Sequence, residues 1–483
     1  MATEVELDAN GRARLPRAAI TVSAPGWSGV ACLRDRAPSG TRTRGEAEIL
    51  PHAAFIDAAM NVDADLEIRA APGRRGAPGS RGGGATGEVK VTLDSPRSDR
   101  DYALLQSDPS GLLHWEFPEK GAGRVSFSLA EPIQHAGGAD GDKRGPITAT
   151  MRIGARIVSW ATDGVTGKLA REVAQAWEQR RRPYFLKATD HDGTESEPDW
   201  ETLTSGRTLL LVHGTFSTPA AGFSGLFGSE EFRTILASYG GRCLAFAHPS
   251  MGAGIDDNLD HLIAHLSKGL PNAGTLDVDI VCHSRGGLVS RAIAAAAKGG
   301  KLPLRVGKLV MVGAPNRGTP LTDAEHWKDF IDRYTNLLVT LPDGALTVAL
   351  EGVLCLVKIL GGGAVEGLPG LAAMHTDGEM LAALKKEALG DVRLYAIAAD
   401  FSPDQKSTLA MLRRGGKDAV DAFFDETNDL VVPTKGCHDL TDTEGFPLPD
   451  ERVHEFSGAV NHLNFFQHQE VRGRLAAVLT DSS

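Results

Sequence analysis

The second half of the chain alternates between short apolar runs and amphipathic runs of helical length, and this alternation constrains the fold more than any other feature. The apolar runs are RTLLLVHG, CLAFAHP, LDVDIVCHS, RVGKLVMVGAP and RLYAIAADF, and helix-like runs such as GSEEFRTILASYG and DDNLDHLIAHLSKGL lie between them. A strand that is apolar along its whole length is buried on both faces, so helices must cover the sheet on each side. We therefore expect an α/β fold with a mostly parallel sheet, which binds ligands at the carboxyl ends of its strands.

The pattern before residue 190 is different. The segments Val89–Leu93, Leu113–Phe117 and Val125–Leu129 alternate between apolar and polar residues, as half-buried strands do. A Gly/Pro/Arg-rich loop, APGRRGAPGSRGGGATG, lies before the first of them and cannot bury a core. We expect residues 1–150 to form a β-rich accessory domain.

A helix and a polar linker are expected over residues 151–200, followed by the α/β domain over residues 201–483. The helix fits KLAREVAQAWEQRR, with one apolar stripe made of Leu169, Val173, Ala176 and Trp177. The segment ATDHDGTESEPDWETLTSG is polar and rich in turn residues, which is typical of a linker. His191 lies between two aspartates there and could bind a metal, but we interpret it as part of the solvated linker.

Composition excludes several classes of protein. The 483 residues carry a net charge of −11 without a long basic stripe, so nothing favours nucleic acid. The five cysteines are odd in number and scattered, which disfavours a disulfide framework or a zinc site, and the sequence shows no cofactor motif. The start, MATEVELDANGRARLP, lacks a signal-like apolar region, and the longest apolar stretch, residues 345–360, is shorter than a membrane span of about 20 residues. We expect a cytoplasmic protein without a transmembrane segment.

The stretch VDIVCHSRGG places Ser284 between a buried strand and an alanine-rich helix. A nucleophilic serine at such a turn has a strained backbone and needs small neighbours two residues away on either side. Gly286 meets this need and Gly287 lets the helix approach the strand, whereas Cys282 departs from the glycine of the G-x-S-x-G pattern. The alternative is that Ser284 only caps the helix, which is a common role for serine.

An anion-stabilising site is expected beside Ser284. The segment Leu211-Val212-His213-Gly214-Thr215 ends an earlier strand, and backbone N–H groups held there would stabilise the negative oxygen of a tetrahedral intermediate. We expect the two donors of this oxyanion hole to be the amides of Thr215 and Arg285, the latter at the start of a helix. His213 is interpreted as a structural residue that orients the loop.

Two further segments supply an acid and a base in the order Ser, Asp, His. Asp429 lies in the turn NDLVVPT, and His462 follows a glycine loop in ERVHEFSGAVNHLNFF. Asp400, at the end of the preceding strand, is the alternative acid, and His454, within the strand-like RVHEF, is the alternative base. A histidine can take the serine proton and return it to a leaving group while a carboxylate holds its tautomer.

These motifs resemble one known family. Residues from about 207 to 480, with VHGT, CHSRGGL, VGAPNRGTPL and NDLVVPT in order, resemble the lipase/esterase branch of the α/β-hydrolase superfamily, in particular its PGAP-type inositol-deacylase-like group. The resemblance implies the α/β-hydrolase fold, with Ser284 as nucleophile, Asp429 as acid and His462 as base. It also implies hydrolysis of carboxylic esters through an acyl-enzyme, and it says nothing about residues 1–190.

An insertion rich in Leu, Val and Ala separates GAPNRGTPL from RLYAIAADF. In this position the resemblance implies a helical cap, at about residues 324–390, and an apolar cap suits a lipid-like or other hydrophobic ester. The alternative is that these helices only complete the core. Met374, His375 and Asp377 precede the last of them and are interpreted as structural.

Two functions therefore remain open. The first is a serine ester hydrolase acting on a small-molecule or lipid ester. The second is a catalytically weak or silent module of the same fold that binds a ligand or a protein partner. Thioesterases, amidases and acyltransferases use the same apparatus, so the sequence does not rank them firmly against an esterase.

Overall fold

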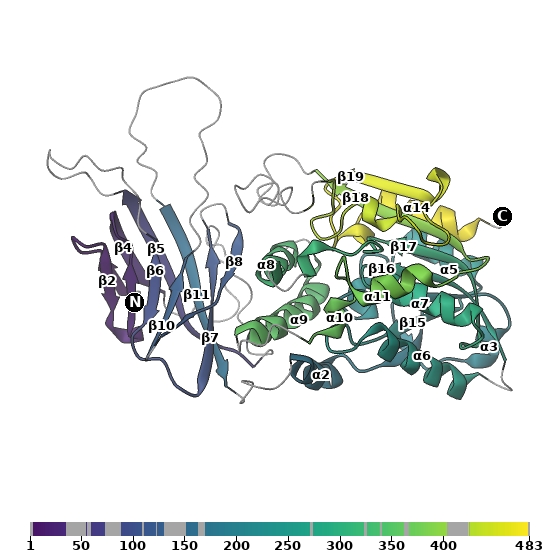
Figure 1. Cartoon of the computed structure of the whole chain (residues 1–483), viewed down its shortest axis with the longest axis horizontal. Helices are drawn as coiled ribbons and strands as arrows, with labels where there is room; N and C mark the ends of the chain where they lie inside the picture. The colour runs from purple at the N-terminus through teal and green to yellow at the C-terminus, as the bar shows by residue number, and fades with distance from the viewer. Residues whose placement is uncertain are drawn as a thin grey trace, which may run out of the picture. The chain divides into compact units, whose positions relative to one another are not determined.

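The chain forms two compact units, of which the first is Met1–Thr166 with two short later segments and the second is the remainder (Figure 1). The computed structural model describes residues 3–34, 55, 59–72, 88–108, 111–121, 123–129, 151–162, 170–270, 274–322, 326–338, 341–361, 367–402, 424 and 426–481. Apart from Ala71 and Pro72, the Gly/Pro/Arg-rich loop lies outside the described residues.

The first unit consists of two antiparallel sheets. One has the order β1 (Thr3–Glu6), β4 (Trp27–Leu33), β5 (Asn61–Pro72), β11 (Met151–Ala161), β7 (Arg100–Ser107), β8 (Leu113–Glu116). The other has the order β2 (Arg12–Leu15), β3 (Ile20–Ser23), β6 (Lys90–Leu93), β10 (Arg124–Ser128), β9 (Glu119–Gly121). Alternate residues of both sheets form one core, so the unit is β-rich, with β6, β8 and β10 where the period-two pattern predicts strands.

In the part of the second unit that the structure describes, eight strands form one sheet, and most of them are parallel. Their order is β13 (Glu195–Ser196), β12 (Phe185–Thr189), β15 (Cys243–Ala247), β14 (Thr208–Val212), β16 (Leu276–His283), β17 (Leu304–Val312), β18 (Arg393–Phe401), β19 (Val453–Gly458). The strands from β14 to β19 run parallel, and β12 is antiparallel to β15. The chain lays β15 on one side of β14 and β16 on the other, so the strand order reverses at β14, the point where ligands bind in such sheets.

Helices cover both faces of this sheet. Alternate residues of β14 to β18 form a core with α5 (Glu230–Ser238) and α14 (Gln469–Thr480). Val281 of β16 belongs to that core, whereas Cys282, on the opposite face, lies beside α7 (Gly286–Lys298), which packs against α6 (Ile255–Gly269). Two shorter helices of this unit are α3 (Trp200–Thr204) and α4 (Pro219–Gly222). Single 3-10 turns occur in this unit at Pro320–Thr322, Lys435–Cys437, Asp450–Arg452 and Phe465–Gln467, and in the first unit at Pro16–Ala18.

The stretch expected to be a helix and polar linker, residues 151–200, contains strands as well as the helix. β11 lies inside the first unit's larger sheet, and β12 and β13 form a hairpin that extends the second unit's sheet. Asp190 begins the hairpin turn, where its carboxylate accepts hydrogen bonds from the amides of Asp192 and Thr194 at 3.0 and 2.9 Å. A hairpin at the edge of a sheet buries few side chains, and Leu186 is one of them here. Its sequence is therefore mostly polar, like that of a linker.

The predicted helix before this hairpin exists as α2 (Ala170–Arg181), but the face that it buries is not the predicted apolar stripe. Its buried residues are Ala170, Ala174 and Glu178, whereas Ala176 is exposed and Trp177 is half-buried. Hydrophobic periodicity could not find this face because one of its three members is a carboxylate.

The insertion forms the helices α8 (Trp327–Leu337), α9 (Asp343–Gly361), α10 (Pro369–Ala372) and α11 (Glu379–Lys386). At 19 residues, α9 is longer than the apolar run suggested, and its mean hydropathy of 1.8 makes it long and apolar enough to cross a membrane by length and composition alone. However, 61% of its apolar window is buried inside the protein, and Glu351 pairs with Arg182 at 3.2 Å. Length and composition are therefore weak evidence for a membrane span, because a buried core or cap helix meets the same criteria.

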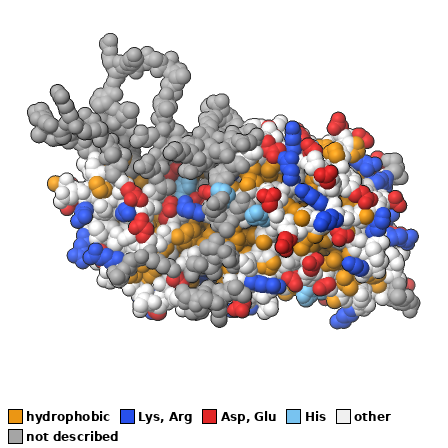
Figure 2. All heavy atoms as spheres, in the orientation of Figure 1, with side chains coloured by type: hydrophobic (Ala, Val, Ile, Leu, Met, Phe, Trp, Pro, Cys, Tyr) orange, Lys and Arg blue, Asp and Glu red, His pale blue; other side chains and the backbone are white. Residues whose placement is uncertain are grey.

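Acidic and basic side chains are interspersed with apolar ones over the described part of the face seen in Figure 2.

Candidate active site

Ser284 directly follows β16 and has the left-handed φ of +55° that a strand-to-helix elbow requires. Its amide donates to the carbonyl oxygen of Val312 at 2.9 Å, which ties the turn to the neighbouring strand. A Cβ on Gly286 would lie 2.5 Å from the carbonyl oxygens of Val212 and His213. Only glycine fits there, which is the small-residue need that the sequence predicts.

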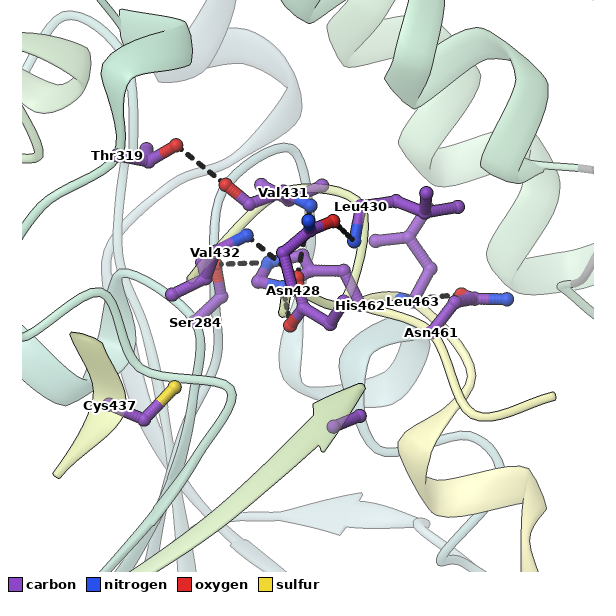
Figure 3. A network of polar contacts seen from close by, with 12 residues as sticks. Ser284, Thr319, Asn428, Leu430, Val431, Val432, Cys437, Asn461, His462 and Leu463 are labelled. Carbon is purple, nitrogen blue, oxygen red and sulfur yellow. Dashed lines mark hydrogen bonds and ion pairs between the residues drawn. The ribbon is translucent and has the colours of Figure 1, made fainter. Parts of the chain in front are cut away.

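Asp429, His462 and Ser284 form a continuous line of hydrogen bonds. His462 Nδ1 lies 2.7 Å from Asp429 Oδ2, and His462 Nε2 lies 2.8 Å from Ser284 Oγ. In Figure 3 the imidazole of His462 points toward Ser284. The tautomer that satisfies both contacts carries its proton on Nδ1, which donates to the carboxylate, and leaves Nε2 to accept from the serine hydroxyl. The structure thus brings together the three residues that the sequence places in separate loops.

Backbone amides hold the Asp429 carboxylate in its orientation. Its Oδ1 accepts from the amides of Val431 and Val432 at 3.0 and 2.7 Å, in a turn where Leu430 has φ +81°. The amide of His462 also donates to the carbonyl oxygen of Asp429 at 3.0 Å. The NDLVVP turn therefore positions both the acid and the loop of the base.

His283 holds the backbone of His462, and the sequence analysis did not predict this role. Its Nε2 donates to the carbonyl oxygen of His462 at 2.8 Å. Burial lowers the pKa of His283 to about 3, so the ring is neutral and can keep this donor role at any working pH. Its position directly before the elbow serine is the one signal that could have marked it.

The amides of Thr215 and Arg285 flank the serine as expected for an oxyanion hole. A Cβ on Gly214 would lie 2.7 Å from Ser284 Cβ, so the end of β14 directly adjoins the elbow. Within the described part of the chain, neither the Thr215 amide nor the Arg285 amide has an acceptor. Two unpaired donors at the strand-order reversal are free to bind a negative oxygen.

His213 orients the loop of Thr215, in keeping with its expected structural role. Its Nε2 accepts from the amide of His248 at 3.1 Å, and the two rings stack with centroids 4.2 Å apart. Burial lowers the pKa of His213 to about 3, so this ring is also neutral.

The alternative acid and base lie elsewhere. Asp400 is registered opposite Ser457 in the β18–β19 ladder, and His454 opposite Ile397. His454 Nε2 has no hydrogen-bond partner among the described residues, and burial lowers the pKa of its ring. Asp429 and His462, not these two, occupy the positions beside Ser284.

Aromatic side chains lie beside His462. Ser284 is only 2% exposed and His462 is fully buried. Tyr334 of α8 packs edge-on against His462 with ring centroids 6.2 Å apart. Phe216 packs edge-on against Tyr334 at 5.2 Å. Tyr334 and Phe216 were missed because neither belongs to a catalytic motif.

One residue read as structural also borders the site. The Thr215 hydroxyl lies 3.9 Å from Met374 Sδ, so the turn before α11 contacts the proposed oxyanion loop. His375 and Asp377 interact locally in that turn, where the Asp377 amide donates to His375 Nδ1 at 3.2 Å.

Cys282 carries a thiol, which could in principle compete with Ser284 as the nucleophile, but its position disfavours this role. It is fully buried on the α7 face of the sheet, with Sγ 3.4 Å from the carbonyl oxygen of Val310, and burial raises the pKa of its thiol to about 12. All five cysteines of the chain are buried.

We expect Cys282→Ala to keep at least about half of the wild-type kcat, because the thiol faces the helix and stays protonated. Measurement of kcat with an activated ester, with folding checked by circular dichroism, tests this. A loss beyond about tenfold in a folded variant would contradict the geometry of the elbow.

Three features together define the α/β-hydrolase class of fold. They are a mostly parallel sheet, a serine elbow at the reversal of strand order, and an acid and a histidine in loops after later strands. The chain belongs to the family described as "Domain of unknown function (DUF7379)", whose match spans residues 178–480.

Comparison with other proteins adds no assigned activity. No curated protein matches the chain. Among solved structures it is similar to the mature lipase BlEst2 of Bacillus licheniformis, with 16% identity, a TM-score of 0.38, and coverage of 62% of this chain and 98% of that one. It is also similar to lipase 1 of Pelosinus fermentans, with 13% identity, a TM-score of 0.35, and coverage of 58% and 99%. Likenesses this distant carry no inference about the reaction.

Proposed function

We propose that the second unit is a serine hydrolase that cleaves carboxylic esters through an acyl-enzyme. The observation that supports this most is the unbroken line of hydrogen bonds from Asp429 through His462 to Ser284. A module that only binds a ligand has no need of a serine in a strained backbone whose hydroxyl is bonded to a carboxylate-oriented imidazole.

Each residue has one role in the proposed reaction. Ser284 Oγ attacks the ester carbonyl while His462 Nε2 takes its proton, and Asp429 stabilises the resulting imidazolium. The amides of Thr215 and Arg285 donate to the oxyanion. When the intermediate collapses, the ester C–O bond breaks and the alcohol leaves with the proton from Nε2. Water then attacks the acyl-enzyme, with His462 again as base, which releases the acid and restores Ser284.

The aromatic side chains beside His462 support a hydrophobic ester as substrate. Phe216, Phe330 and Tyr334 form a mutually packed aromatic group, with centroid distances of 4.7–5.9 Å, beside the triad. Apolar walls with few polar groups favour an acyl chain or aromatic ring over a charged one. A lipid ester would also agree with the PGAP-type resemblance, which stays a prediction, as does the cytoplasmic location.

Fluorophosphonate labelling and ester hydrolysis test the proposal together. We expect one phosphonyl group per chain, found on the peptide that contains Ser284, and higher kcat/KM for p-nitrophenyl esters of medium-length acids than for the acetate. Heat-denatured protein is the control. Absence of labelling at Ser284 in folded protein would instead favour the non-catalytic binding module, and a preference for the acetate would contradict the hydrophobic substrate.

A further inference from the structure

Glu178 of α2 is a buried carboxylate that the proposed reaction does not use. It is 1% exposed, and it accepts hydrogen bonds from three consecutive amides in the loop after β15. The amides of Ser250 and Met251 donate to Oε1 at 2.6 and 2.8 Å, and that of Gly252 donates to Oε2 at 2.8 Å. Both carboxylate oxygens are therefore engaged by donors from one short segment, Ser250–Gly252.

The side chain of Arg285 donates to an acceptor directly after the same segment. Its guanidinium is fully buried and donates to the carbonyl oxygens of Gly370 and Ala253 at 2.8 and 2.9 Å, and to Asn258 Oδ1 at 3.0 Å. Burial raises the pKa of Glu178 above its ordinary value, although the three amides and the positive charge of Arg285 act in the opposite direction. Glu178 thus holds the amides of Ser250–Gly252, and Arg285 holds the next carbonyl group, that of Ala253.

This loop leads directly to both donors of the proposed oxyanion hole. The hydroxyl of Ser250 accepts from the amide of Phe216 at 3.1 Å, and Phe216, with φ +56°, is the residue after Thr215. The second donor is the backbone amide of Arg285 itself. The position of the Thr215 amide therefore depends on Ser250. The position of the Arg285 amide depends on the Arg285 side chain, which is anchored beside Ser250.

A purely structural role explains this arrangement less well. A buried carboxylate costs several kcal/mol unless its partners compensate, and an apolar contact would fix a helix to a sheet without that cost. Three charge-assisted hydrogen bonds to consecutive amides instead fix the direction of a backbone segment. Precise backbone direction is what an oxyanion hole requires.

We propose that Glu178 is a positioning residue that holds the Ser250–Gly252 loop and, through it, aligns the Thr215 and Arg285 amides toward the oxyanion. The inference rests on the proposed function, since an oxyanion hole has a role only if Ser284 attacks an ester. Among the described residues, the hydrogen bonds of Glu178 go to the Ser250–Gly252 amides and not to the triad, so its role is to position the backbone.

The substitution Glu178→Gln in the full-length protein tests this role. Glutamine keeps the size of the side chain but places an NH2 group against at least one of the three amide donors. We expect kcat per active site to fall about 10- to 100-fold, somewhat less than for complete loss of an oxyanion donor, with KM within about twofold of wild type. Affinity for a trifluoromethyl ketone, which forms a tetrahedral oxyanion adduct, should fall by the same factor as kcat/KM.

Glu172→Gln is the matched control, because Glu172 lies in the first turn of the same helix and is exposed. Titration of active sites with a fluorophosphonate gives the fraction of folded enzyme in each preparation. A variant with fewer titratable sites but a wild-type kcat per site would show that Glu178 only stabilises the fold, and would overturn the inference. A wild-type kcat with a raised KM would also overturn it.

Ser250→Ala provides a second test if Glu178→Gln does not fold. It removes the acceptor of the Phe216 amide and leaves the bonds of Glu178 to the backbone intact. Parallel losses of kcat and trifluoromethyl ketone affinity, of about tenfold, support the inference, and unchanged values overturn it. Failure of the proposed function is distinct, because wild-type protein would then show no labelling at Ser284.

Discussion

Ser284→Ala is expected to lower kcat for an activated ester by about a million-fold, close to the limit of detection. The substitution removes the attacking oxygen, and no other nucleophile can replace it, because Cys282 lies on the far side of the elbow with its thiol protonated. The fold should be retained, because the hydrogen bond from the amide of residue 284 to the carbonyl oxygen of Val312 involves only backbone atoms.

The measurement compares kcat, fluorophosphonate labelling and the melting temperature of Ser284→Ala with those of wild type. A melting temperature within a few degrees excludes unfolding as the cause of the loss. Retention of more than a few percent of the activity would falsify the assignment of the nucleophile, provided that contamination by host esterases is excluded with a mock purification.

His462→Ala is expected to lower kcat by several orders of magnitude, in line with the loss of a triad base. No other imidazole can replace it, because Nε2 of His462 is the nitrogen bonded to Ser284 Oγ, and the nearby His283 is engaged with the carbonyl oxygen of residue 462. Asp429→Asn should cost somewhat less, about four orders of magnitude, because the wrong tautomer is favoured while the geometry is kept.

The control variants are His454→Ala and Asp400→Asn, which alter the same residue types in the adjoining strands β19 and β18. Each should keep kcat within about tenfold of wild type. Assay of all four variants under one set of conditions decides the assignment. If His454 or Asp400 proved the more damaging member of its pair, the acid–base assignment would be wrong while the hydrolase proposal could stand.

The residues of the proposed triad could be predicted because each follows the end of a strand. The carboxyl ends of parallel strands meet at one edge of a sheet, so Ser284 after β16, Asp429 after β18 and His462 after β19 are brought together once the strands are recognised. Thr215 and Arg285 follow from the same rule, because they flank the reversal of strand order.

Glu178, Tyr334 and the β12–β13 hairpin could not be predicted in this way. The partners of Glu178 lie 72 to 74 residues further along the chain, and a carboxylate on a helix is usually solvated. Tyr334 comes from an insertion whose packing the motifs do not describe. The hairpin is recognised only through its pairing with β15, which is a long-range contact.

The place of the hairpin in the sheet also has a consequence for synthesis of the protein. The ribosome releases α2, β12 and β13 before every other strand of this sheet, yet the neighbour of β12 on the sheet side is β15, some 55 residues later. Until that strand and the following loop emerge, the carboxylate of Glu178 stays in water and the amides of Ser250–Gly252 do not yet exist to receive it. The earliest part of this unit to be made therefore reaches its native surroundings only after residues 243–252 have followed it.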